Sequence, residues 1–143
     1  MSNDVRTIKT GFGDFEISER DIVTFPRGLP GFERCQRFVL LSHETFAPLR
    51  CLHATDGPEA TFLAIDPRSI VPDYMRPLRP EELAQVDAEP DTALVWLALV
   101  AFTSENVPTA NLRAPIVINP VSMRGAQIVV DDERFTARHE LAA

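Results

Sequence analysis

The sequence has little of what catalysis, secretion or membrane insertion requires. Its 143 residues include two cysteines and three histidines, and no serine lies in a Gly-x-Ser-x-Gly turn of the kind that presents a nucleophile. The longest apolar run, residues 93–102, is about half of the roughly 20 residues that a membrane-spanning helix needs. Residues 1–10 contain no apolar stretch resembling a secretion signal. We therefore predict a cytoplasmic protein that is not an enzyme and does not enter a membrane.

Positive charge is also scarce. The chain has 14 Lys and Arg against 21 Asp and Glu, which gives a formal net charge of −7. A field of this sign repels phosphate backbones and steers basic proteins toward the surface. The sequence therefore disfavours direct nucleic-acid binding and favours a basic protein partner.

Length and composition indicate one domain over residues 1–143. The chain is 45% hydrophobic and 24% charged, as soluble globular domains are. A chain of this size can bury about 68–70% of its unfolded surface, so it needs neither a disulfide nor a metal to fold. Residues 1–10 could be less ordered and residues 140–143 form a tail. We expect a monomer when the protein is on its own.

Twelve prolines, spread from Pro26 to Pro120, interrupt the chain and exclude long helices. One short helix is expected over 80–86, because proline is tolerated in a first turn and the acidic pair after it suits the helix dipole. Short apolar runs between the prolines suit strands. The expected fold is therefore all-β and mainly antiparallel, a compact barrel-like or roll domain with one short helix. The expected strands are 12–17, 21–25, 37–41, 49–54, 61–65, 116–118 and 126–130.

Two segments carry most of the topological information. Residues 116–118 and 127–130 flank a stretch with Asn, Pro and Gly that can reverse the chain, so a hairpin is expected there. Residues 92–103 are ambiguous. Their Leu and Ala suit a helix, whereas their unbroken apolar run also suits a strand buried on both faces.

Four possible metal ligands, Cys35, His43, Cys51 and His53, fall close together in the sequence. Their spacing lacks the Cys-x2-Cys pair of common structural zinc sites. A small metal-dependent enzyme, or a disulfide between the two cysteines, remains an alternative to the simpler interpretation as buried or surface residues. We expect no cofactor, no metal and no catalytic residue.

Three segments could contact a partner instead of serving structure alone. Residues 72–91 hold six acids and two arginines, which makes them either a solvated connection or the docking face for a basic protein. Residues 28–33 form a bent loop in which Phe32 is either structural or an exposed anchor. In residues 109–115, Asn111 either satisfies its own backbone in a turn or faces a ligand.

Several blocks resemble the FliW family of flagellar assembly factors. The first is residues 22–33 (IVTFPRGLPGFE) with 38–41, followed in order by 62–67, 72–74, 109–119, 125–129 and 136–139. The resemblance covers about residues 11–141, and its most specific block is TANLRAP. One departure is Leu52-His53-Ala54, where the family commonly has Leu-Gln-Ser, so the polar contact of that glutamine is not expected here. The resemblance favours a strand over residues 92–103.

The resemblance implies a switch between protein partners. FliW proteins bind the basic RNA-binding repressor CsrA and release flagellin mRNA from it, and flagellin in turn binds FliW. A flagellin chaperone without CsrA antagonism is the closest alternative. The residues expected to contact proteins are Phe32, Glu33, Asp73, Tyr74, Glu81, Glu82, Asp87, Glu89 and Asn111.

Overall fold

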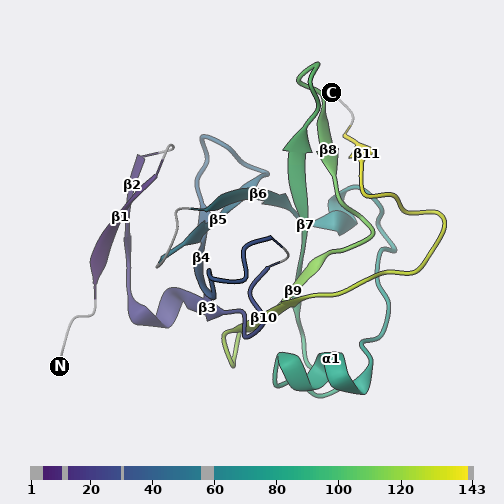
Figure 1. The fold of residues 1–143 in the computed structure, drawn as a ribbon, viewed down its shortest axis with the longest axis horizontal. Coiled ribbons are helices and arrows are strands. Elements are labelled where there is room, and N and C mark those ends of the chain that lie inside the picture. The colour runs from purple at the N-terminus through teal and green to yellow at the C-terminus, as the bar shows by residue number, and fades with distance from the viewer. Residues whose placement is uncertain (1–4, 11–12, 30, 56–59, 142–143) are drawn as a thin grey trace.

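Short strands are the main regular elements of the computed structural model, which describes residues 5–10, 13–29, 31–55 and 60–141 (Figure 1). One α-helix and two 3-10 helices interrupt them. The elements in chain order are β1 (Arg6–Thr10), β2 (Gly13–Ile17), η1 (Glu19–Asp21), β3 (Ile22–Thr24), β4 (Arg37–Ser42), β5 (Arg50–Ala54), β6 (Thr61–Ile65), η2 (Pro67–Ser69), α1 (Pro80–Gln85), β7 (Val95–Phe102), β8 (Pro108–Ala110), β9 (Ile116–Asn119), β10 (Arg124–Gln127) and β11 (His139–Glu140).

Strands β3, β4, β5, β6, β7, β9 and β10 close into a barrel. Each neighbouring pair from β3 to β7 is antiparallel, and β7 also pairs with β9, which pairs with β10. The ring closes where β10 runs parallel to β3, through the single residue pair Arg124 and Thr24. The observed fold is therefore a mainly antiparallel β-barrel with one short helix, which confirms the predicted fold class.

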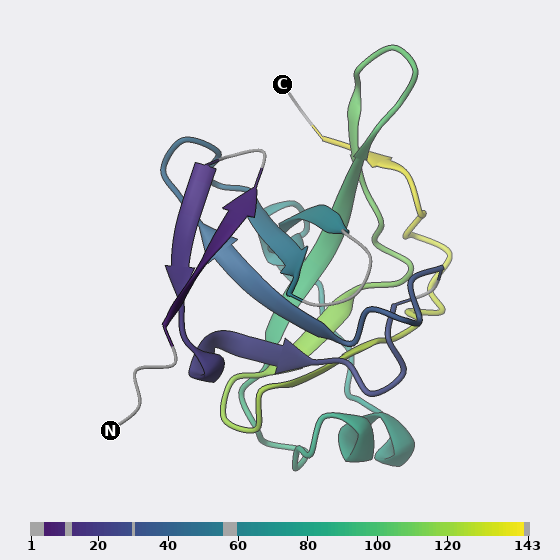
Figure 2. The same cartoon turned by 60° about the vertical axis from the view of Figure 1, so that its left-hand side comes forward.

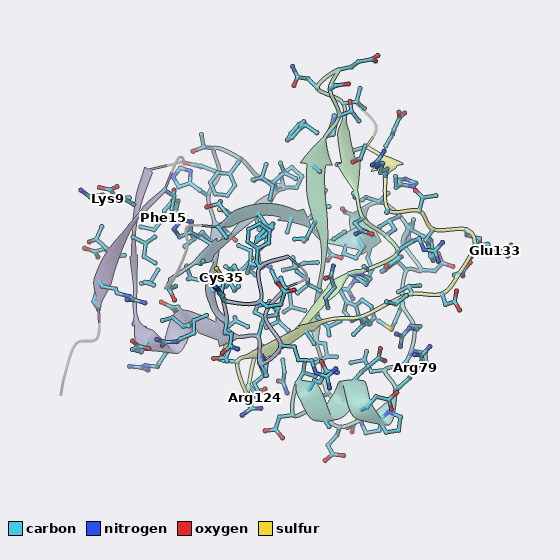
Figure 3. All side chains as sticks on the ribbon, in the orientation of Figure 1. Lys9, Phe15, Cys35, Arg79, Arg124 and Glu133 are labelled. Atoms are coloured by element: carbon cyan, nitrogen blue, oxygen red, sulfur yellow. The ribbon has the colours of Figure 1, made fainter. Side chains whose placement is uncertain are left out.

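Two additions lie outside the ring. Strands β8 and β11 extend the sheet beyond β7, and β1 and β2 form a separate hairpin beside the barrel (Figure 2). On this hairpin Phe15 turns toward the barrel and packs against a cluster that includes Val39 and Leu41, whereas Lys9 is exposed (Figure 3). Strand β1 thus begins inside the segment that could have been less ordered, and β11 includes the first residue of the expected tail.

Strand β7 resolves the ambiguity of residues 92–103. Trp96 and Ala98 point into one hydrophobic cluster, while Leu97 points into another. A strand covered on both faces needs no polar alternation, which is why its sequence reads as an unbroken apolar run. No helix among the described residues is long and apolar enough to cross a membrane.

The β9–β10 hairpin is present, but its second strand begins earlier than expected. Arg124 pairs with Asn119 directly after the turn, and the strand ends at Gln127 instead of covering 126–130. The turn is tight because Met123 adopts a positive φ of 56° and its N–H donates to the Asn119 carbonyl. Beyond Gln127 the Ile128 N–H donates to the Pro115 carbonyl. The prediction placed this strand too late because it followed the apolar residues, which continue beyond the last residue pair of the β9–β10 ladder.

Candidate functional site

Helix α1 fixes the middle of the acidic segment, residues 72–91, to the barrel. Asn119 at the end of β9 donates its side-chain amide to the carbonyls of Val86 and Asp87, both at 3.0 Å. The Ser122 hydroxyl also donates to the Val86 carbonyl, at 2.8 Å. These bonds satisfy backbone groups that the end of a helix leaves without partners. The acidic segment is therefore held by the barrel at this point.

An ion pair ties the start of the helix to the same surface. Arg76 donates two parallel hydrogen bonds to the Glu82 carboxylate, each 2.8 Å long, and also donates to the Val129 carbonyl at 2.7 Å. The Arg79 backbone N–H donates a third hydrogen bond to Glu82 at 2.8 Å, which is the bond that the third helical residue of a capping box accepts. These hydrogen bonds, chiefly those from Arg76, lower the pKa of Glu82.

Tyr74 and Glu82 are not available as contact residues, contrary to expectation. Tyr74 is 1% exposed and donates its hydroxyl to the Leu112 carbonyl at 2.5 Å. Burial raises the pKa of Tyr74 to about 12. Glu82 is 8% exposed and is held by Arg76. Glu82 was expected at the surface because of the charge density of the segment, and Tyr74 belongs to the block 72–74 of the family resemblance. Each side chain instead bonds a polar group of the fold.

Four predicted carboxylates of the acidic segment are exposed: Asp73, Glu81, Asp87 and Glu89. Asp87 follows the helix with a positive φ of 54°, and the N–H groups of Asp87 and Ala88 donate to the carbonyls of Ala84 and Leu83. This pattern is the Schellman motif, in which glycine is the usual residue at the position of Asp87. The end of α1 thus presents the Asp87 carboxylate on a backbone with a defined conformation.

The loop between β3 and β4 is bent as predicted. Gly28 has a φ of 62°, and a Cβ there would lie 2.7 Å from the Glu33 Cα, so only glycine fits. Phe32 is 40% exposed, and its ring meets Phe62 edge to face with centroids 5.0 Å apart. Phe32 is therefore both packed and accessible, and Glu33 beside it is exposed.

The bent loop and the acidic segment border one groove. This groove has a volume of about 430 Å³, and its lining includes Glu33 from the loop, Gln85 from α1, and Gly125 and Gln127 from β10. Glu81 lies one helical turn before Gln85 and therefore on the same side of α1. The structure thus brings together two features that the sequence could only propose separately.

Asn111 lies at a different place. It follows β8, and its side-chain oxygen accepts hydrogen bonds from the N–H groups of Arg113 and Ala114, both at 3.1 Å. It is half-buried and lines a separate hollow together with Arg138. Of the two roles proposed for Asn111, the turn role is the one with recorded hydrogen bonds.

The described cysteines and histidines do not gather. Within the described residues no three His, Cys, Asp or Glu side chains lie where they could share a metal ion. Cys35 and Cys51 are buried and are not joined by a disulfide, and burial raises the pKa of Cys51. A raised pKa keeps a thiol protonated and therefore a poor nucleophile. His53 is buried in β5, with its Nδ1 2.6 Å from the Thr61 hydroxyl.

Charge counting overlooked the apolar side chains of the acidic segment. Met75 is 62% exposed and borders a hollow of about 290 Å³, whose lining includes Leu78, Leu83 and Trp96. The sequence does contain these apolar residues, spaced between the prolines of residues 72–91. The hollow could not be predicted from them, because neither the fold of the segment nor the position of the neighbouring β7 could be derived from the sequence.

Comparison with known proteins gives a consistent result along most of the chain. Residues 6–141 match the family model described as FliW protein. A flagellar assembly factor FliW from Natranaerobius thermophilus is 35% identical over 132 residues, which cover 91% of this chain and 87% of that protein. One from Thermotoga petrophila is 32% identical over 136 residues, covering 94% and 91%. A crystal structure of the flagellar assembly factor FliW superimposes with a TM-score of 0.84 at 33% identity, covering 96% of this chain and 98% of that one.

Proposed function

This chain belongs to the FliW family of flagellar assembly factors, and from that membership we propose that it antagonises the RNA-binding translational repressor CsrA. CsrA held by this chain no longer occupies the flagellin message, so flagellin synthesis resumes. Flagellin is the second partner, and it sequesters the chain until it is exported. Such a switch requires the chain to bind RNA-free CsrA more tightly than RNA-bound CsrA.

The exposed carboxylates of the acidic segment carry this proposal. A protein that holds RNA must be basic, so an acidic face attracts it and raises the rate of encounter. Asp73, Glu81, Asp87 and Glu89 supply such a face. The two arginines of the segment offset little of this negative charge. Arg76 is paired with Glu82, which leaves Arg79 as the one other basic residue opposite the four exposed carboxylates.

Calorimetric titration of the purified chain into CsrA tests the proposal. We expect saturable binding that weakens between low and moderate salt, since screening reduces attraction between exposed charges. A flagellin mRNA fragment bound to CsrA should be released as the chain is added. Absence of heat with CsrA, together with saturable binding to flagellin, would leave a flagellin chaperone as the function.

Charge reversal locates the CsrA contact. The variant Glu81→Lys, Asp87→Lys, Glu89→Lys should slow association about tenfold or more at low salt and flatten its salt dependence. A matched control reverses three exposed acids on other elements, Asp14, Glu44 and Glu105. Both variants change the net charge equally, so equal effects would show that only total charge matters and would contradict a local face.

Phe32 and Glu33 are proposed as a second contact. Glu33 lines the groove between the bent loop and α1, and Phe32 is its neighbour in the loop. Truncating Phe32 to alanine should weaken binding to CsrA or flagellin, because aromatic anchors contribute strongly to interfaces. The control is Phe102→Ala, which removes an exposed phenylalanine at the end of β7. Normal binding of both partners by the Phe32 variant would make this loop structural only.

A further inference from the structure

The hollow beside Met75 combines a mostly apolar lining with a single carboxylate, that of Glu89. Its walls include Leu78, Leu83, Leu94 and Trp96, and its volume is about 290 Å³. A cavity of about 150 Å³ lined by similar side chains suffices to hold a benzene ring. The hollow is therefore large enough for one bulky side chain, and it is smaller than most pockets for whole small-molecule ligands.

The charges around the hollow are unbalanced. Two of its lining residues are cations, but Arg68 is paired with Asp66 at 3.3 Å and Arg76 with Glu82 at 2.8 Å. The third charged lining residue is Glu89, for which no ion pair is recorded within the described part of the chain. An apolar site next to an unpaired carboxylate complements a ligand that is apolar and positively charged at once.

We propose that this hollow receives a basic, amphipathic segment of the protein partner, with one large apolar side chain inside and a Lys or Arg beside Glu89. The inference rests on the proposed function, because it assigns the anchoring point for the basic partner on the acidic segment. Charge then sets the rate of approach, and the apolar side chain sets how long the complex lasts. Exposed Met75 at the rim becomes covered on binding.

The only tryptophan of the chain lies in this hollow and reports on its occupancy. Trp96 is 4% exposed and its ring meets Tyr74 edge to face, with centroids 6.1 Å apart. Replacing it with 5-fluorotryptophan gives one fluorine resonance from the chain. Titration with unlabelled CsrA should move this resonance with the same midpoint as the calorimetric heat.

Ala93 allows the hollow to be filled from within the chain. Its side chain is exposed and borders the hollow, so Ala93→Leu places extra methyl groups there without entering the core. We expect CsrA affinity to fall about tenfold or more, mostly through faster dissociation, with the salt dependence unchanged. The control is Ala101→Leu, which adds the same side chain at an exposed position in the separate hollow near Asn111.

The outcomes separate the inference from the proposed function. Suppose that calorimetry shows CsrA binding, but the fluorine resonance of Trp96 does not shift and Ala93→Leu binds CsrA with unchanged affinity. This result would overturn the inference and leave the proposed function standing. No CsrA binding by the unmodified chain would overturn both. A Trp96 shift caused by flagellin alone, or by raising the concentration of the chain alone, would assign the hollow to flagellin or to a second copy and would also overturn the inference.

Discussion

Neutralising Glu82 without changing its shape should destabilise the protein in a pH-dependent way. In Glu82→Gln the side chain keeps one acceptor, so it retains one bond from Arg76 or Arg79 but loses the charge opposite the guanidinium. Removing one partner of a buried pair typically costs about 3–5 kcal/mol. The pair is slightly exposed, with 19% and 11% of the two side chains accessible, and the amide retains some hydrogen bonding. We therefore expect a loss of about 1–3 kcal/mol near pH 7.

The sign of the pH effect follows from the lowered pKa of Glu82. A carboxyl with a lower pKa in the folded state stabilises the fold above its unfolded pKa and loses that contribution as pH falls through the folded pKa. The unmodified chain should therefore begin to lose this advantage as the pH falls below about 4.5. It should reach the stability of Glu82→Gln only once the pH lies below the lowered pKa of the folded state, where the Glu82 carboxyl is also neutral.

Urea unfolding followed by Trp96 fluorescence measures the difference. With slopes of about 1–3 kcal/mol/M, a loss of about 2 kcal/mol lowers the midpoint by roughly 1 M at pH 7. Glu81→Gln is the matched control, since Glu81 is the exposed neighbour on α1 and its loss should stay within about 0.5 kcal/mol. Equal midpoints at pH 7, or a gap that persists unchanged at low pH, would refute the role given to the ion pair.

Three further substitutions test the local geometry. Asp87→Gly should raise the free energy of unfolding by about 0.5–1 kcal/mol in a urea titration, because glycine adopts positive φ without strain. Tyr74→Phe should lower it by about 1–3 kcal/mol by leaving the buried Leu112 carbonyl without its donor, and in the unmodified chain phenolate absorbance should rise only near pH 12. Gly28→Ala should lower the thermal midpoint clearly, since its Cβ would meet the Glu33 backbone at 2.7 Å; an unchanged midpoint would mean that the loop can move aside.

The barrel strands were predictable where apolar runs and turn residues agree. Helix α1 was placed within a residue of its observed end because proline and two glutamates mark its start. Strands β1, β8 and β11 were missed, since they are short or polar and are defined by their pairing partners. Only β11 pairs with a strand distant in the chain, whereas β1 and β8 pair with the adjacent strands β2 and β7, so for these two the weak apolar pattern is the reason.

The candidate site was predictable in outline but not in its details. The number of acidic residues identified the acidic segment, and the glycines of residues 28–33 identified the bent loop. The sequence did not show which polar residues are exposed, and Tyr74 and Glu82 are buried in the structure. Opposite behaviour of the adjacent residues Glu81 and Glu82 shows why: they differ in the face of α1 on which they lie, and only the packed fold defines that face.

The narrow joint between β3 and β10 makes ring closure a distinct event in folding. The other joints of the barrel are antiparallel and hold three to five residue pairs each, whereas this one holds a single parallel pair. It unites the first barrel strand with the last, so a growing chain cannot form it until nearly all of the barrel has been synthesised. Contacts between residues so distant in the chain form slowly, because the intervening loop must be ordered first. Hairpins such as β4–β5 and β9–β10 can therefore form ahead of closure, and the meeting of Thr24 with Arg124 completes the barrel.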